Sequence, residues 1–291
     1  MPNVASCARR AALAVGVLAA AAVTTPAQSL AYVGGLQYAT GDFIFTQRTW
    51  SAYFSNGLTW SAGRLRASAS VPLVMQPAGW LQYSGAGAIV PTGGMTGSAG
   101  SPTTGAGSGS GMHGGTMTPS SSMPFSGVGI GDPIGRVDVA LAGADAGRPS
   151  VSLVGAVKAP FADVGRGFGT GQWDVGAGLS GAVTVGGTSV LADAVYWRVG
   201  NPAGASLRNA LAYALSIGRA LPRSRWSVLG TVSGASSLWT GLAAPVQAGL
   251  GVGYLQESGR SVFVTAAAGL TRTAPAISTG LGWRVPLGTT R

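Results

Sequence analysis

The sequence predicts an all-β protein, an antiparallel up-and-down transmembrane β-barrel of about 12 strands. Only 9% of its 291 residues are charged while 46% are hydrophobic, and a soluble surface needs more charge than this. No run of about 18 apolar residues follows the N-terminal segment, so a helical membrane protein is not expected. Only helices and closed barrels satisfy their backbone hydrogen bonds within lipid. Segments of alternating polarity, separated by turn residues, therefore indicate a barrel.

The N-terminal segment 1–31 is typical of a secretory signal peptide. An apolar run at 11–23 is too short to span a bilayer, and small residues follow it. Cleavage after Ala27 or after Ala31 satisfies the small-residue rule. We therefore expect an outer-membrane barrel domain over residues 32–291, inserted into outer-membrane lipid by the barrel assembly machinery.

The charge distribution argues against nucleic acid as a partner. The chain carries 18 basic and 8 acidic residues, and removing Arg9 and Arg10 with the signal lowers the formal charge from +10 to +8. The arginines are scattered singly instead of being clustered with aromatic residues. We expect them to line the lumen or to meet anionic lipid headgroups.

Several segments alternate between apolar residues on one face and polar or small residues on the other. In 173–185, Val175 and Leu179 share a face, and Asp174 and Ser180 share the opposite one. The same division occurs at 151–159, 207–217, 262–270 and 277–287. One face of each segment suits lipid and the other suits water. Aromatic residues expected to form interfacial girdles are Trp173, Trp197, Tyr213, Trp226, Tyr254 and Trp283.

Turn signals between the segments alternate in length, which assigns a side of the membrane to each link. Tight periplasmic turns are expected at Asn56-Gly57, 145–148, 186–187, 221–224 and 257–259. Longer extracellular links are expected at 77–131, 161–170, 200–206 and 237–243.

The same alternation sets the number of strands. The first clear segment, at 42–54, runs toward a periplasmic turn, so a weaker strand at 32–39 must precede it. This makes about twelve strands, or about ten if one segment is only a loop extension.

Charged residues on the polar faces are the first candidate for a functional site. The alternation directs into the lumen Arg64, Arg66, Lys158, Arg208, Arg284, Asp138, Asp174 and Asp193. They form either a salt-bridge network that fills the barrel or a mildly cation-repelling pore lining. The other inward positions are mostly Gly, Ala and Ser, and a barrel of about twelve strands is wider than one that side chains alone fill. A narrow channel is therefore expected, unless a loop plugs it.

The stretch 91–126, within the long link, is a second candidate. Gly, Ser, Thr and Pro dominate it, so it is expected to form a mobile extracellular loop. Met112, His113 and Met117 offer three soft donors that suit Cu(I). Against a metal site, no thiolate or carboxylate joins them, and ordering such a loop costs entropy.

An enzyme is not expected, and neither is a cofactor. His113 is the only histidine and has no acidic residue beside it, which leaves no positioned base for a nucleophile. The only cysteine, Cys7, precedes the apolar run and leaves with the signal. The glycine cluster at 165–171 is not followed by a helix, so it is not a phosphate-binding loop.

Three short motifs resemble one outer-membrane family. They are GVGIGDP at 127–133, VKAP at 157–160 and GTGQWD at 169–174, and with Val71-Pro72 they span most of the mature chain. In these motifs the chain is similar to the outer-membrane protein family named for the meta pathway of phenol degradation. The resemblance implies a transporter, and Asp132, Lys158 and Asp174 match the family's recurrent polar positions. The chain departs from the family at 161–163, where Phe-Ala-Asp replaces Thr-Gly-Asp.

Together these features predict a Gram-negative outer-membrane channel or transporter for passive uptake of small solutes, aromatic or hydrophobic ones among them. The alternative is a barrel that only anchors the Met/His loop, as a surface or copper-binding protein.

Overall fold

The computed structural model describes residues 28–42, 48–76, 81–83, 89–91, 127–143, 148–164, 168–201 and 207–290. Its strands are β1 (Gln28–Gly41), β2 (Thr49–Ala62), β3 (Leu65–Gln76), β4 (Leu81–Tyr83), β5 (Ile89–Pro91), β6 (Gly127–Ile130), β7 (Ile134–Ala142), β8 (Ser150–Lys158), β9 (Asp174–Val185), β10 (Thr188–Arg198), β11 (Ala210–Ala220), β12 (Trp226–Ala235), β13 (Val246–Leu255), β14 (Ser261–Gly269) and β15 (Ile277–Thr290). No helix in these ranges is long and apolar enough to cross a membrane.

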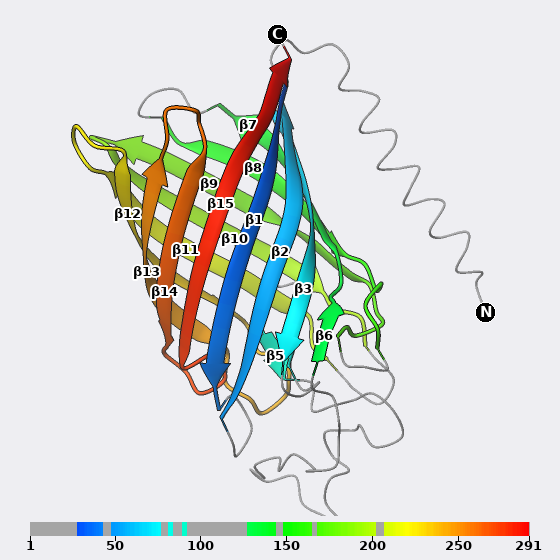
Figure 1. Cartoon of the computed structure of the whole chain (residues 1–291). Helices are drawn as coiled ribbons and strands as arrows, with labels where there is room; N and C mark the ends of the chain where they lie inside the picture. Colours follow the sequence, from blue (N-terminus) through cyan, green and yellow to red (C-terminus); the bar gives the residue numbers. More distant parts are fainter. Residues whose placement is uncertain are drawn as a thin grey trace, which may run out of the picture.

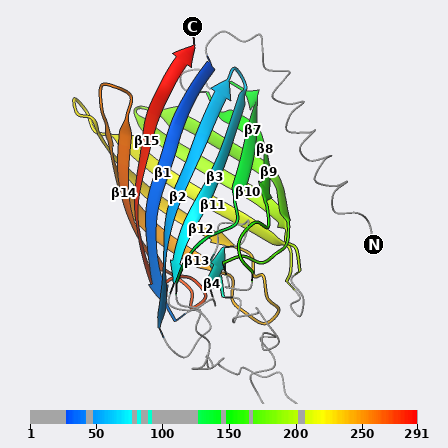
Figure 2. The ribbon, with the colours of Figure 1, turned by 45° about the vertical axis from the view of Figure 1, so that its right-hand side comes forward.

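Twelve antiparallel positions form a closed ring (Figure 1). The main sheet has 13 strands, but β6 and β7 both pair with β3 and share one position, which leaves twelve. β1 closes the ring by pairing with β15 on one side and with β2 on the other. The predicted fold class and strand number are therefore confirmed. The separate hairpin of β4 and β5 lies near the end of the barrel where β3 ends (Figures 1 and 2).

The two faces of the wall alternate as the sequence predicts. On β11, Leu211, Leu215 and Ile217 are 43%, 55% and 58% exposed on the outer face. Ala212 and Ala214, between them, lie opposite Val195 and Asp193 on the inner face. The ladder carries this division from strand to strand around the ring, because paired residues share a face. The apolar outer band and the closed ring make the chain an outer-membrane β-barrel.

Short and long links separate at the two ends of the barrel. The short turns are 63–64, 186–187, 221–225 and 256–260, and seven residues connect β7 to β8 at the same end. Gly186 and Gly187 have φ of 57° and 79°, the left-handed conformation that a two-residue hairpin turn requires. Short turns of such barrels face the periplasm, so we call this the periplasmic end and the opposite end the outer end.

The predicted turn at Asn56-Gly57 is wrong. Both residues lie inside β2, and the chain turns at Gly63-Arg64, where Gly63 has φ of 54°. Asn56 faces outward with Leu58, and its Oδ1 accepts a hydrogen bond of 2.5 Å from the Tyr32 hydroxyl. This bond gives the amide oxygen a partner within the lipid-facing wall. Asn56 can therefore lie inside a strand, although an Asn-Gly pair usually indicates a turn.

Other boundaries also differ from the prediction. The first two strands cover 28–41 and 49–62 instead of 32–39 and 42–54, and the residues between them form an outer link. β6 belongs to the wall although the long link was expected to run from 77 to 131. A further outer link, at 270–276, was not predicted.

The predicted aromatic girdles are present with one exception. Trp226 contacts Tyr254 near the periplasmic end, and Trp173 contacts Phe161 near the outer end. Trp197, by contrast, points inward and is only 5% exposed. Its position opposite Gly176 leaves room for an indole inside the wall, which explains the exception.

The start of β1 bears on signal cleavage, which stays a prediction. β1 begins at Gln28, and Ala31 is fully buried between Thr59 and Pro286. Cleavage after Ala31 would remove the first four residues of this closing strand, whereas cleavage after Ala27 keeps it whole. We expect mass spectrometry of the chain purified from outer membranes to find Gln28 at its N-terminus. A mature chain beginning at Tyr32 would contradict this.

Candidate functional site: the barrel lumen

The burial of interior side chains changes along the lumen. Near the outer end, the inward residues Tyr53 and Val195 are only 4% and 3% exposed. Near the periplasmic end, the inward residues Leu191, Leu229 and Phe263 are 43%, 36% and 48% exposed. The lumen is therefore filled toward its outer end and hollow toward the periplasm.

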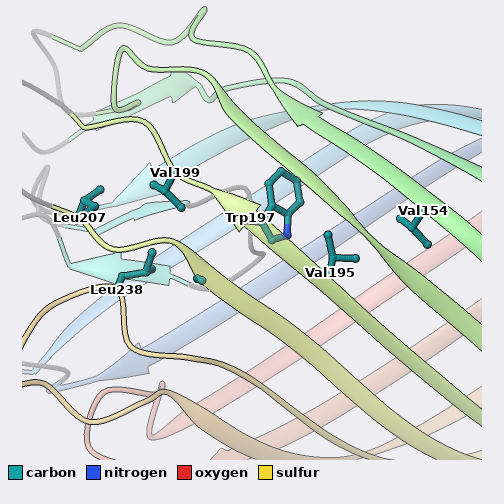
Figure 3. Close-up of a cluster of buried hydrophobic side chains, with 7 residues drawn as sticks. Val154, Val195, Trp197, Val199, Leu207 and Leu238 are labelled. Atoms are coloured by element: carbon teal, nitrogen blue, oxygen red, sulfur yellow. The ribbon is translucent and has the colours of Figure 1, made fainter.

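An apolar cluster occupies part of the filled end (Figure 3). We call it the outer cluster, and its members are Val154, Val195, Trp197, Val199, Leu207, Ala210 and Leu238. They come from β8, β10 and β11 and from the links 199–209 and 236–245. A Cβ atom at Gly176 would lie 2.9 Å from the Trp197 indole, so glycine lets this ring lie flat on the wall. The cluster thus narrows the lumen and holds two outer links inside it.

A triad of buried charged side chains lies beside this cluster, near the short segment that connects β6 to β7. Lys158 Nζ is 2.8 Å from Asp132 Oδ2 and 3.4 Å from Asp174 Oδ2. It also donates a hydrogen bond of 2.8 Å to Thr170 Oγ1. The Lys158 and Asp174 side chains are fully buried and that of Asp132 is 3% exposed. Such burial is stable only when each charge is paired and hydrogen-bonded.

Backbone groups from two outer links satisfy the remaining carboxylate oxygens of the triad. Ala162 N donates to Asp132 Oδ1 at 3.0 Å, and Gly200 N donates to Asp174 Oδ1 at 3.0 Å. Gly169 packs against Asp132, where a Cβ atom would lie 2.8 Å from the carboxylate. The triad thus fastens the links after β8 and β10 to the wall.

A second ion network crosses the inner wall closer to the middle of the barrel. Arg136 Nη2 lies 2.7 Å from Asp138 Oδ1 and 2.6 Å from Asp193 Oδ2. Arg136 and Asp138 are on β7 and Asp193 is on β10, so the guanidinium spans the two strands between them. The three side chains are 33%, 17% and 33% exposed, respectively. This network, the lumen strut, leaves a net charge of −1 in contact with the lumen.

The structure brings together four of the predicted lumen residues and separates the others. Lys158 contacts Asp174, and Asp138 and Asp193 share Arg136. Arg66 and Arg284 face inward by register, opposite Asp138 and Val33 respectively. Among the described residues neither has a carboxylate within ion-pair distance.

Arg64 and Arg208 are not on a lumen-facing strand. Arg64 lies in the turn between β2 and β3, and Arg208 lies in the link before β11. Both residues lie just beyond the strand ends, where the alternation of faces no longer sets the direction of a side chain. Arg136 was missed, although it shares its inward face with Asp138 two residues away.

The hollow half of the lumen carries an apolar patch. We call Leu191, Leu229 and Phe263 the lumen patch; they come from β10, β12 and β14. A Cβ atom at Gly218 would lie 2.9 Å from Leu229, and one at Gly282 would lie 2.0 Å from Phe263. Leu229 and Phe263 therefore lie over glycines of neighbouring strands. The patch is an exposed apolar surface inside a barrel whose other inward residues are mostly small or polar.

The predicted metal donors Met112, His113 and Met117 lie outside the described residues. Within the described ranges, no group of three or more His, Cys, Asp and Glu residues could hold a metal ion. The copper-binding alternative therefore stays a prediction.

Comparison with solved structures finds similar outer-membrane proteins over most of the chain. An outer-membrane channel from Pseudomonas putida F1 matches with a TM-score of 0.58 at 10% identity, over 90% of this chain and 96% of that chain. The β domain of the Bordetella autotransporter BrkA matches with a TM-score of 0.41 at 13% identity, over 89% and 98%. The Pseudomonas putida toluene transporter TodX matches with a TM-score of 0.38 at 9% identity, over 92% of each.

At such low identity, the first likeness shows the fold alone. No protein-family model matches the chain, and no curated protein sequence matches it. The resemblance to the meta-pathway family therefore stays a prediction.

The triad is expected to stabilise the folded barrel. Lys158→Met removes the cation that lies between two buried carboxylates, which costs about 3–5 kcal/mol of folding free energy. Urea titration of the refolded barrel, followed by tryptophan fluorescence, measures this loss. Adding Asp132→Asn and Asp174→Asn to Lys158→Met should recover part of the stability, because no uncompensated charge then remains. An unchanged urea midpoint for Lys158→Met alone would show that the triad is not needed.

The lumen strut is expected to affect whether the barrel conducts cations or anions better. Arg136→Gln leaves Asp138 and Asp193 without their shared cation, which changes the strut charge from −1 to −2. The reversal potential in a salt gradient across a planar bilayer should therefore shift toward cation selectivity. Arg219→Gln is the matched control, because Arg219 faces outward at the periplasmic end of β11. Equal reversal potentials for Arg136→Gln and this control would place the strut away from the ion path.

Proposed function

We propose that this barrel is a passive outer-membrane channel for small apolar solutes, aromatic ones included. The observation that carries the proposal is the lumen patch. Its apolar side chains are exposed to water inside the barrel, so binding of an apolar solute to them is favoured by the hydrophobic effect. The filled outer end also supports selective passage, since it opposes free diffusion of large polar solutes.

The charge arrangement supports passage instead of catalysis. The triad is buried and each of its carboxylate oxygens faces a donor, so its carboxylates already have partners within the protein. The lumen strut is likewise internally paired. The charged residues therefore act as supports that hold the wall and the outer links in place.

The proposal also accounts for the small residues of the lumen. Gly218 and Gly282 make room for Leu229 and Phe263, so the apolar surface is presented without blocking the hollow half. A solute that binds to this patch loses contact with water and gains contact with apolar side chains. The arrangement fits a planar or compact molecule without charge. The resemblance to the meta-pathway family agrees with this solute class.

The test is uptake of a neutral naphthylamine fluorophore by cells that carry the barrel at a fixed surface amount. Leu229→Gln with Phe263→Gln should slow the fluorescence rise by roughly tenfold, because that factor corresponds to losing about 1.4 kcal/mol of apolar contact. Ser233→Gln is the control, because Ser233 faces the lumen outside the patch. Uptake of the dye at the same rate in the double variant and the control would refute the role of the patch.

A further inference from the structure

A cleft on the rim of the barrel carries two arginines that have no carboxylate within ion-pair distance among the described residues. It has a volume of about 620 Å³ and lies where β10 ends and β11 begins. Arg198, Arg208, Asn201, Asn209 and Tyr196 line it. Among the described residues, neither arginine forms an ion pair. Two guanidinium groups that are not paired with a described carboxylate favour the binding of an anion.

The cleft lies at the outer edge of the apolar band, at the level where the lipid tails meet the headgroups. Arg198 is the last residue of β10 and pairs with Val175, an outward residue that is 54% exposed. Tyr196, two residues earlier on the same face, is also 54% exposed. Because aromatic residues of such barrels mark the edge of the apolar band, Arg198 projects just beyond the lipid tails. A ligand in this cleft therefore contacts the headgroup layer.

The two asparagines that line the cleft accept backbone hydrogen bonds through their side-chain oxygens. Val199 N donates to Asn209 Oδ1 at 3.3 Å, and Leu207 N donates to Asn201 Oδ1 at 2.8 Å. With both side-chain oxygens already used by the backbone, the amide NH₂ groups are left to donate. The polar side chains thus present donors from four groups, which matches a ligand rich in acceptor oxygens.

The outer cluster supports the described part of the cleft from inside the barrel. Val199 and Leu207, which form its inner wall, are 6% and 8% exposed and belong to that cluster. Arg208 N donates to Leu238 O at 2.8 Å, which ties the cleft to the link after β12. A site held from inside loses little conformational entropy when it binds a ligand.

We propose that this cleft binds a phosphate group of a phosphorylated lipid in the outer leaflet. Arginine suits phosphate because its planar guanidinium donates two parallel hydrogen bonds to it. The boundary position favours a lipid over a dissolved ion, because the lipid presents its phosphate at that level while its tails contact the apolar wall below. The proposal does not depend on what crosses the lumen.

The experiment is native mass spectrometry of the refolded barrel in detergent with diphosphorylated lipid A. The wild type should retain one lipid A molecule per barrel. Arg198→Gln with Arg208→Gln should weaken retention by about tenfold or more, because charge-assisted hydrogen bonds to phosphate are lost. Arg219→Gln with Arg260→Gln removes the same charge near the periplasmic end and should retain lipid A like the wild type. Heat-modifiable gel mobility confirms that each variant is folded.

Two further arms distinguish the lipid from a free anion. Lipid A stripped of both phosphates should bind weakly to the wild type and to the cleft variant alike. Millimolar inorganic phosphate should leave most of the bound lipid A in place. Equal retention of lipid A by the cleft variant and the control variant would overturn the proposal. Complete displacement by inorganic phosphate would assign the cleft to a dissolved anion and would overturn it as well.

Discussion

Every backbone N–H and C=O group that crosses a bilayer must find a partner within the protein. β1 meets this requirement for the whole barrel, because it pairs with β15 and with β2 and so leaves the ring without an edge. Once the ring is closed, paired residues share a face, and the strict alternation of apolar and small residues follows. The Tyr32 bond to Asn56 shows the same rule for a side chain, since a polar group in the wall needs a partner.

Closure with twelve strands creates a second constraint, because the interior is wider than small side chains can fill. The interior is filled in different ways at different levels of the lumen. At the outer end, the triad and the outer cluster bind the links after β8 and β10 to the inner wall. Farther in, Arg136 reaches across two strands to Asp193. Toward the periplasm nothing comparable fills the described lumen, and Leu229 and Phe263 remain exposed there.

Patterns that repeat along a strand could be predicted from the sequence, whereas partners across the lumen could not. Strand parity led to twelve strands although the Asn56-Gly57 turn on which it relied lies inside β2. The two inward aspartates Asp138 and Asp193 were identified by alternation, but their common partner depends on the curvature of the ring. Trp197 was placed in a girdle because tryptophan favours interfaces; its inward position depends on Gly176, on the neighbouring strand.

The account depends most on the claim that the barrel wall divides lipid from an open periplasmic half of the lumen. Single cysteines test it directly, because the one cysteine of the sequence, Cys7, precedes the barrel and lies in the predicted signal peptide. A membrane-impermeant maleimide applied from the periplasmic side should label Leu229→Cys, which faces the lumen. It should leave Val228→Cys unlabelled beneath lipid and Val195→Cys unlabelled within the outer cluster. Labelling of Val228→Cys with protection of Leu229→Cys would contradict the assignment of the two faces.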